Sequence, residues 1–222
     1  MTIFNEFDRI RIVNLPKRRD RRRAMNRELS RLGLQDDPRV AYFPAIRPAD
    51  QGDFTSIGAR GVYASQKALL AEASQAGESI LILEDDCTFR SGASEYSCSP
   101  GWDIFYGGYY ASDPEHLARS DIIGAHMMGF SAQGARAVHA YLSTLEYTGI
   151  HPPIDAAYVW FRRANPDVVT HFAVPPLANQ RSSRSDIASL RIYDRLPVVR
   201  EVVNSLRFFK RLYSSRIDRQ GS

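Results

Sequence analysis

Short apolar runs alternate along this chain with segments whose apolar positions recur every three or four residues. The runs predict β-strands at 10–15, 40–43, 79–83, 102–106, 126–130 and 168–174. The helical periodicity predicts helices at 18–33, 61–76, 131–145 and 156–163. Strands that alternate with helices are typical of a layered α/β domain with a largely parallel sheet.

Polar segments between these elements are expected to form loops, at 47–60, 91–101, 109–122 and 178–194. Gly107 and Gly108 are expected to end the strand at 102–106. The irregular segment 109–122 that follows them is a candidate lid.

The strand at 79–83 ends in three consecutive acids, Glu84, Asp85 and Asp86. Neighbouring carboxylates repel one another unless a cation lies among them. Ligands of open α/β sheets bind at the carboxyl ends of the strands. The pattern therefore predicts a hard-cation site where a substrate would bind, and the alternative is an acidic, solvated turn.

The composition is that of a globular protein, with 222 residues, 44% hydrophobic and 24% charged. No apolar run is long enough to span a bilayer, and we expect no signal peptide, so the expected location is cytoplasmic. Cys87 and Cys98 lack the spacing of a zinc or redox motif and are expected to be free thiols.

The net charge of +4 is concentrated near the C-terminus, where residues 195–219 hold seven basic and two acidic residues. The near-neutral remainder argues against a nucleic-acid-binding protein. Segment 197–213 has apolar residues at helical spacing with arginines opposite, which predicts a basic amphipathic helix. Two interpretations stay open: 196–219 contacts an anionic membrane surface, on the inner face of the cytoplasmic membrane, or the helix packs on the domain. We divide the chain into a domain at 1–195 and a tail at 196–222.

Several short motifs occur in a fixed order between about residues 10 and 187. They are Ile12-Val13-Asn14-Leu15 followed by Arg18-Arg19-Asp20-Arg21-Arg22, Val40-Ala41-Tyr42-Phe43-Pro44-Ala45, Gly58-x-x-Gly61-x-x-x-Ser65, Leu81-Ile82-Leu83-Glu84-Asp85-Asp86, Trp102-Asp103-Ile104, Phe130-Ser131-x-x-Gly134-Ala135, Pro153-Ile154-Asp155 and Ser185-Asp186. In this order they resemble the family 25 glycosyltransferases, the lipooligosaccharide galactosyltransferase-like enzymes related to the collagen galactosyltransferases. The chain departs from the family at Gln66, where the family usually has a histidine.

The resemblance implies a GT-A-like nucleotide-sugar-binding fold with a mainly parallel central sheet flanked by helices. It implies inverting transfer of a sugar, commonly galactose from UDP-galactose, to a bacterial surface glycan such as lipooligosaccharide. The expected partners are a UDP-hexose donor and a glycan or lipid-linked glycan acceptor, with Mn²⁺ or Mg²⁺ as cofactor.

A divalent cation improves a diphosphate leaving group, and Mg²⁺ or Mn²⁺ is bound by one or two protein carboxylates plus phosphate oxygens. Glu84 and Asp86 are two residues apart and so point to the same side of an extended strand. We predict Asp86 as the main metal ligand, with Glu84 binding the metal or orienting the ribose. Asp85 is assigned to donor binding.

Inverting transfer also needs a base for the acceptor hydroxyl. Asp155 matches the family position and is the first candidate, with a plain helix N-cap as the alternative. Asp186 is the second candidate, with a turn residue as the alternative.

Donor binding is further predicted for Asn14, Leu15, Arg22 and Ser65, on the family pattern. For Asn14 the alternative is a turn residue that ends a strand. For Arg22 the alternative is one more solvated side chain on a basic helix.

Two other function classes were weighed. A non-catalytic relative that binds a nucleotide-sugar or glycan is favoured by Gln66, because an amide cannot act as an acid or base near neutral pH. A phosphatase is disfavoured, because the haloacid-dehalogenase-type motif needs an aspartate where this chain has Glu84.

Overall fold

The structure, a computed structural model, describes residues 2–181. Asp186, the predicted domain boundary at 195/196 and the predicted amphipathic helix therefore lie outside the described residues. Within the described part, none of the helices has the length and apolarity needed to cross a membrane.

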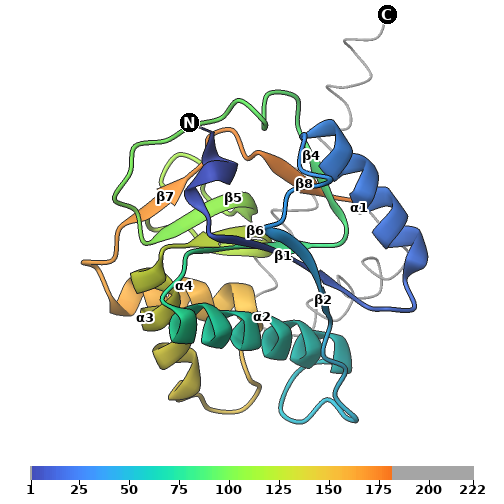
Figure 1. The fold of residues 1–222 in the computed structure, drawn as a ribbon. Coiled ribbons are helices and arrows are strands. Elements are labelled where there is room, and N and C mark those ends of the chain that lie inside the picture. Colours follow the sequence, from blue (N-terminus) through green and yellow to red (C-terminus); the bar gives the residue numbers. More distant parts are fainter. Residues whose placement is uncertain (1, 182–222) are drawn as a thin grey trace, which may run out of the picture. The chain divides into compact units, whose positions relative to one another are not determined.

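A six-stranded sheet forms the centre of the fold (Figure 1). Its strands, in spatial order, are β2 (Val40–Pro44), β1 (Arg9–Asn14), β3 (Ile80–Glu84), β6 (Ile122–Phe130), β5 (Ile104–Ala111) and β7 (Thr170–Phe172). β1 is parallel to β2 and β3, and β5 is parallel to β7, whereas β6 runs antiparallel to β3. The predicted α/β class with a mainly parallel sheet is confirmed.

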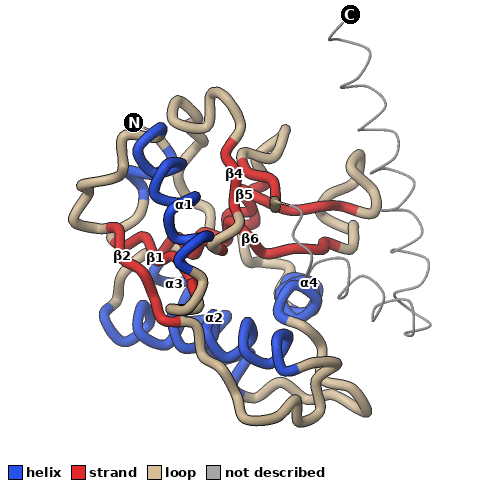
Figure 2. The backbone as a smooth tube through the Cα atoms, turned by 90° about the vertical axis from the view of Figure 1, so that its right-hand side faces the viewer, coloured by secondary structure: helices blue, strands red, loops and turns tan. Residues whose placement is uncertain are grey.

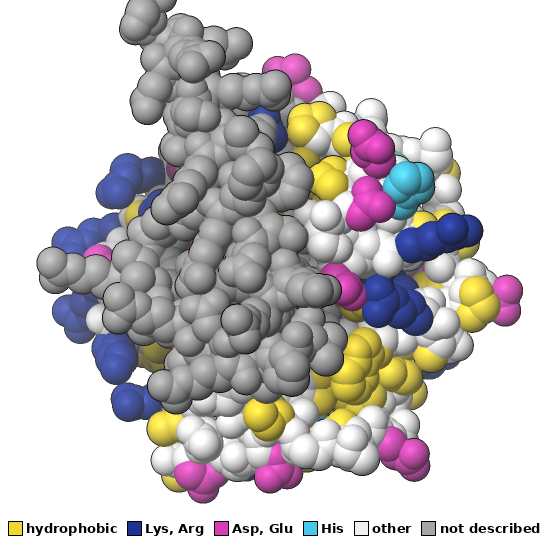
Figure 3. All heavy atoms as spheres, turned by 180° about the vertical axis from the view of Figure 1, so that it is seen from behind, with side chains coloured by type: hydrophobic (Ala, Val, Ile, Leu, Met, Phe, Trp, Pro, Cys, Tyr) yellow, Lys and Arg dark blue, Asp and Glu magenta, His cyan; other side chains and the backbone are white. Residues whose placement is uncertain are grey.

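Helices flank both faces of this sheet, as Figures 1 and 2 show from two sides. One face is covered by α2 (Ile57–Ala76), α3 (Ala132–Ser143) and α4 (Ile154–Ala164). On the other face lie the 3₁₀-helix η1 (Ile3–Glu6), α1 (Arg19–Arg31) and a small sheet of β4 (Cys87–Phe89) and β8 (Ala178–Gln180). The exposed arginines of α1 make one edge of the surface basic (Figure 3).

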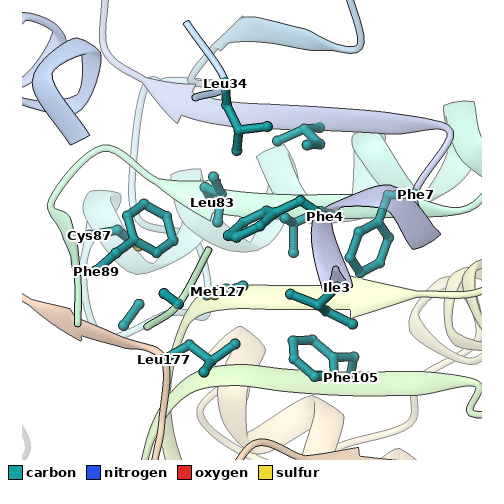
Figure 4. Packing of buried hydrophobic residues seen from close by; sticks show 14 of the residues in the cluster. Ile3, Phe4, Phe7, Leu34, Leu83, Cys87, Phe89, Phe105, Met127 and Leu177 are labelled. Carbon is teal, nitrogen blue, oxygen red and sulfur yellow. The ribbon is translucent and has the colours of Figure 1, made fainter. Parts of the chain in front are cut away.

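The N-terminal residues are part of the hydrophobic core (Figure 4). Ile3, Phe4 and Phe7 are buried against Leu83 of β3 and Met127 of β6 in one cluster. Burial of one aliphatic or aromatic side chain contributes roughly 1.5–3 kcal/mol to the free energy of folding. The short N-terminal segment therefore stabilises the packing on this face of the sheet.

Several boundaries differ from the predicted ones. α2 begins four residues earlier than predicted, because Ser56 caps it by accepting a hydrogen bond from Ala59 N at 3.0 Å. The prediction that Gly107 and Gly108 end a strand was wrong: β5 runs through both of them. A Cβ atom on either glycine would collide with the side chain of Met127 or His126 on β6, so the pair permits close strand packing.

The strands β4 and β8 were not predicted, because each has only three residues, too few for a periodic pattern to indicate a strand. They form by pairing with each other, with Cys87 opposite Gln180. β7 is shorter than the predicted strand at 168–174.

The chain divides into two units, one made of 1–109 and 123–181 and the other of 110–122 with 182–222. In the second unit, residues 110–122 are described. Ser112 N donates to Asp121 O at 3.0 Å, and Asp113 N donates to Ser120 Oγ at 2.9 Å. The candidate lid is therefore a hydrogen-bonded loop between β5 and β6, and its movement stays a prediction.

Within the motif Gly58-x-x-Gly61-x-x-x-Ser65, the second glycine allows a close approach of backbone to α2. A Cβ atom on Gly61 would lie 2.6 Å from Ile46 O, whereas one on Gly58 would meet nothing nearer than 3.7 Å. We expect Gly61→Ala to lower the free energy of unfolding by about 1–3 kcal/mol, because backbone must shift. Gly58→Ala is the matched control and should be neutral or slightly stabilising in urea unfolding. Equal effects of the two substitutions would contradict this account.

His126 predicts a pH dependence of stability. It is fully buried, its Nε2 lies 3.0 Å from Ala178 O, and burial lowers its pKa to about 4. The unfolded chain, with a histidine pKa of about 6.5, binds a proton between pH 6.5 and 4 that the folded chain does not. Stability should therefore fall by about 3 kcal/mol as pH drops through this window. Urea unfolding of His126→Gln should show a shallower slope there, and an unchanged slope would contradict the prediction.

Candidate active site

The three acids at the C-terminal end of β3 lie at the edge of the sheet where β1 also ends. β1 and β3 are parallel with Val13 opposite Glu84, so Asn14 and the acids emerge side by side. Asp85 and Asp86 are only 6% and 4% exposed. The alternative of an acidic, solvated turn is therefore wrong, and the buried carboxylates need partners in the protein.

Asp85 and Asp86 share a guanidinium group. Arg21 Nη1 lies 2.8 Å from Asp85 Oδ1 and 2.9 Å from Asp86 Oδ2. Asn14 Nδ2 donates to the other oxygen of Asp85 at 2.7 Å. One cation and one amide, both from the β1–α1 segment, thus compensate the buried charge at the end of β3.

The small β4–β8 sheet brings two further residues to the acids. Gln180 Nε2 donates to Glu84 Oε2 at 3.1 Å and lies 3.5 Å from Asp86 Oδ2. Arg181 N donates to Asp86 O at 2.8 Å, and Arg181 Nη2 donates to the carbonyls of Asp85 and Cys87. Sequence reasoning missed both residues, because they lie in a segment that it assigned to a loop.

Asp155 lies in the first turn of α4, and the N-cap position is Pro153. The alternative that Asp155 is a plain N-cap is therefore wrong. Its Oδ2 accepts a hydrogen bond from Gly124 N at 2.9 Å and its Oδ1 accepts one from Ala156 N at 3.0 Å. These two contacts fix the orientation of the carboxyl group.

The four carboxyl groups interact electrostatically. Burial raises the pKa of Glu84 well above its usual range, the negative charges of Asp86, Asp155 and Asp85 raise it further, and Arg21 opposes them. Burial also raises the pKa of Asp155, against hydrogen bonds from the backbone that lower it. The structure thus brings a predicted catalytic residue, Asp155, within electrostatic reach of a predicted metal ligand, Glu84.

The acids fit a hard cation that also has ligands from a substrate. Within residues 2–181, no group of three or more His, Cys, Asp or Glu side chains is placed to hold a metal ion. Glu84 and Asp86 both face the amide nitrogen of Gln180, which agrees with their expected orientation to one side of the strand. Two carboxylates are what Mg²⁺ or Mn²⁺ takes from a protein when phosphate oxygens complete its shell.

Three other predicted residues lie outside this cluster. Arg22 is exposed and its guanidinium stacks over the ring of Tyr42, 4.2 Å from the centroid. Leu15 is partly exposed just after β1. Ser65 is fully buried, where its Oγ donates to Gly61 O at 2.7 Å and accepts from Ile46 N at 2.8 Å. Their binding roles stay predictions.

Gln66, where the chain departs from the motif resemblance, is fully buried in α2. Its Oε1 accepts a hydrogen bond from Tyr158 OH at 2.8 Å, and its Nε2 has no hydrogen-bond partner among residues 2–181. Burial is the main cause that raises the pKa of Tyr158, and the charges of Glu84 and Asp155 raise it further. Tyr158, the partner of Gln66, therefore lies within electrostatic reach of both acids.

Comparison with known proteins does not identify the function of this site. No protein-family model and no curated protein sequence matches the chain. Among solved structures, it is similar to a glycosyltransferase involved in the glycosylation of the major capsid of PBCV-1, with 13% identity and a TM-score of 0.47 over 80% of this chain and 96% of the other. It is also similar to a Bacillus anthracis protein described as a glucose-1-phosphate thymidylyltransferase, in complex with sucrose, with 9% identity and a TM-score of 0.39 over 73% and 66%. Likenesses of this size do not establish an activity.

The hydrogen bond between Asn14 and Asp85 is testable by a double-mutant cycle. We expect Asn14→Ala to lower the free energy of unfolding by about 1–3 kcal/mol, because it removes a donor from a buried carboxylate. The cycle with Asp85→Ala should give a coupling energy of about 1 kcal/mol or more in urea unfolding. Additive effects would contradict the contact, and Asn179→Ala, an exposed position, serves as the control.

Proposed function

We propose that this protein is a metal-dependent inverting glycosyltransferase that uses a UDP-hexose donor. The observation that carries the proposal is that Glu84 and Asp86 lie with Asn14 at the carboxyl edge of two parallel strands, with Asp155 near enough for its charge to raise the pKa of Glu84. This is the edge at which α/β sheets bind ligands. The motif resemblance supports UDP-galactose as donor and a surface glycan such as lipooligosaccharide as acceptor.

In this proposal Asp86 and Glu84 hold the Mn²⁺ or Mg²⁺ ion. The ion, when bound, neutralises the charge that develops on the departing diphosphate. Asn14 Nδ2 is committed to Asp85, so its amide oxygen is the group offered to a ribose hydroxyl. Asp85 then contributes to donor binding by orienting the amide group of Asn14.

Asp155 is the proposed base. Its orientation is fixed by Gly124 N and Ala156 N, and burial moves its pKa upward, in the direction that a base working near neutral pH requires. It would take the proton from the acceptor hydroxyl as that oxygen attacks the anomeric carbon from the face opposite the diphosphate. Asp186 remains the second candidate for this role.

Metal-dependent donor binding is the first expected result. In titration calorimetry, UDP should bind the wild-type protein in the presence of Mn²⁺ and bind far more weakly without it. Asp86→Asn should abolish the Mn²⁺ effect, because it removes the negative charge of one of the two carboxylates proposed to hold the ion. Asp167→Asn removes an exposed carboxylate and should leave UDP binding unchanged. Absence of UDP binding under both conditions would overturn the proposal.

The base is tested separately from the binding site. Asp155→Asn should keep Mn²⁺-dependent UDP binding while it lowers kcat by about 10²–10⁴-fold. The measurement is UDP release from UDP-galactose in the presence of a truncated lipooligosaccharide acceptor. Wild-type turnover by Asp155→Asn would move the role of base to another residue.

A non-catalytic nucleotide-sugar or glycan-binding protein is the second candidate function. Gln66 favours it, because a buried amide replaces a side chain that can exchange protons. Mn²⁺-dependent UDP binding without transfer to any glycan would select this candidate.

A further inference from the structure

We propose that Arg21 is an internal competitor of the metal: it neutralises Asp85 and Asp86 in the empty site and transfers to the diphosphate of the donor when the metal binds. This inference rests on the proposed function, since it concerns the same metal and donor.

The contact geometry places Arg21 on the predicted metal ligand. Its Nη1 lies 2.9 Å from Asp86 Oδ2, the same oxygen that lies 3.5 Å from Gln180 Nε2 beside Glu84. The guanidinium thus contacts Asp86 at the oxygen that faces Gln180 Nε2, the amide nitrogen that also donates to Glu84. A divalent ion held by Glu84 and Asp86 would meet a like charge there, and two cations on one carboxylate repel.

Asp85 keeps a partner when Arg21 leaves. Asn14 Nδ2 donates to Asp85 Oδ2, whereas Arg21 contacts Asp85 Oδ1. Departure of the guanidinium therefore exposes one oxygen of Asp85 and one of Asp86 to new cationic partners without leaving Asp85 unsupported. The metal can replace the compensating charge that Arg21 supplied.

Once the donor is bound, its diphosphate offers Arg21 a second set of hydrogen-bond acceptors. Arg21 belongs to the first turn of α1, where the helix dipole also favours an anion. A guanidinium binds phosphate oxygens through paired hydrogen bonds. The diphosphate brought by the donor is the natural new partner, since the metal and phosphate arrive on the same side of the acids.

This exchange couples metal and donor binding. Metal alone must displace Arg21 without giving it a new partner, which weakens the apparent affinity for the metal. Metal together with a nucleoside diphosphate provides that partner, so each ligand should strengthen the binding of the other by the same factor. A site of this kind would bind Mn²⁺ poorly until the donor is present.

The test measures Mn²⁺ and UDP binding separately. For Arg21→Gln we expect the Kd for Mn²⁺ alone, from loss of the free-ion signal in electron paramagnetic resonance, to fall by about tenfold or more. The Kd for UDP at saturating Mn²⁺ should rise by about tenfold or more, because a charge-assisted phosphate contact is lost. Opposite signs of the two changes distinguish an exchanging group from one that only supports the fold.

Arg23→Gln is the matched control, since it removes the same charge from an exposed position on the same helix. It should change both constants less than twofold, on the order of a surface effect. Arg21→Lys keeps the charge without the planar fork and guards against a folding defect in Arg21→Gln; it should change both constants in the same directions by smaller factors.

Two results would overturn the inference while leaving the proposed function intact. One is wild-type Mn²⁺-dependent UDP binding with no change in Mn²⁺ affinity in Arg21→Gln. The other is weaker Mn²⁺ binding in that variant, which would make Arg21 a support for the metal ligands. If the wild-type protein and Arg21→Gln both bind neither Mn²⁺ nor UDP, the inference and the proposed function fail together.

Discussion

The compensation of buried negative charge at the end of β3 is the constraint on which this site depends. Asp85 and Asp86 leave the sheet almost completely buried, and an isolated carboxylate in that position would be strongly destabilising. Arg21 and Asn14 supply the compensation from the neighbouring β1–α1 segment. Removing either partner would leave charge uncompensated in the interior, so the stability of this edge and its chemistry are linked.

The fold produces this arrangement through the pairing of strands that are distant in the sequence. Parallel β1 and β3 bring Asn14 next to the acids, and α1 follows β1 closely enough for Arg21 to reach them. The β4–β8 sheet adds Gln180 and Arg181, whose main-chain and side-chain donors hold the turn after β3. Asp155, whose charge acts on Glu84, lies on α4, which covers the face of the sheet opposite α1 (Figure 1).

Local patterns predicted the parts of the fold that depend on burial. The run Ile80–Leu83 was predicted to be a strand buried on both faces, and all four residues are fully buried in β3. The helix predicted at 131–145 is α3, and Ser131 caps it because its Oγ accepts a hydrogen bond from Gly134 N at 2.9 Å. Such features are encoded within a few residues, where propensity and periodicity act.

Features that depend on tertiary pairing were not predictable from one sequence. Gln180 lies in β8, a three-residue strand that forms by pairing with β4, and β4 is far away along the chain. Adjacent arginines of α1 have different surroundings: Arg21 contacts the acids and Arg22 stacks over Tyr42. The choice between them depends on how the helix is rotated against the sheet, which the basic run at 17–23 does not reveal. Ser65 was predicted from a motif to bind the donor, and its hydroxyl contacts the backbone of the loop after β2 and of α2.

The central claim is that the acids after β3 form a metal–diphosphate site, and the most direct test is a crystal structure with Mn²⁺ and UDP. Anomalous scattering from manganese locates the ion independently of any assumption about its ligands. The account predicts one strong anomalous peak within coordination distance of the carboxylates of Asp86 and Glu84, with the diphosphate on the same ion. A manganese peak elsewhere, with UDP bound away from the end of β3, would contradict it.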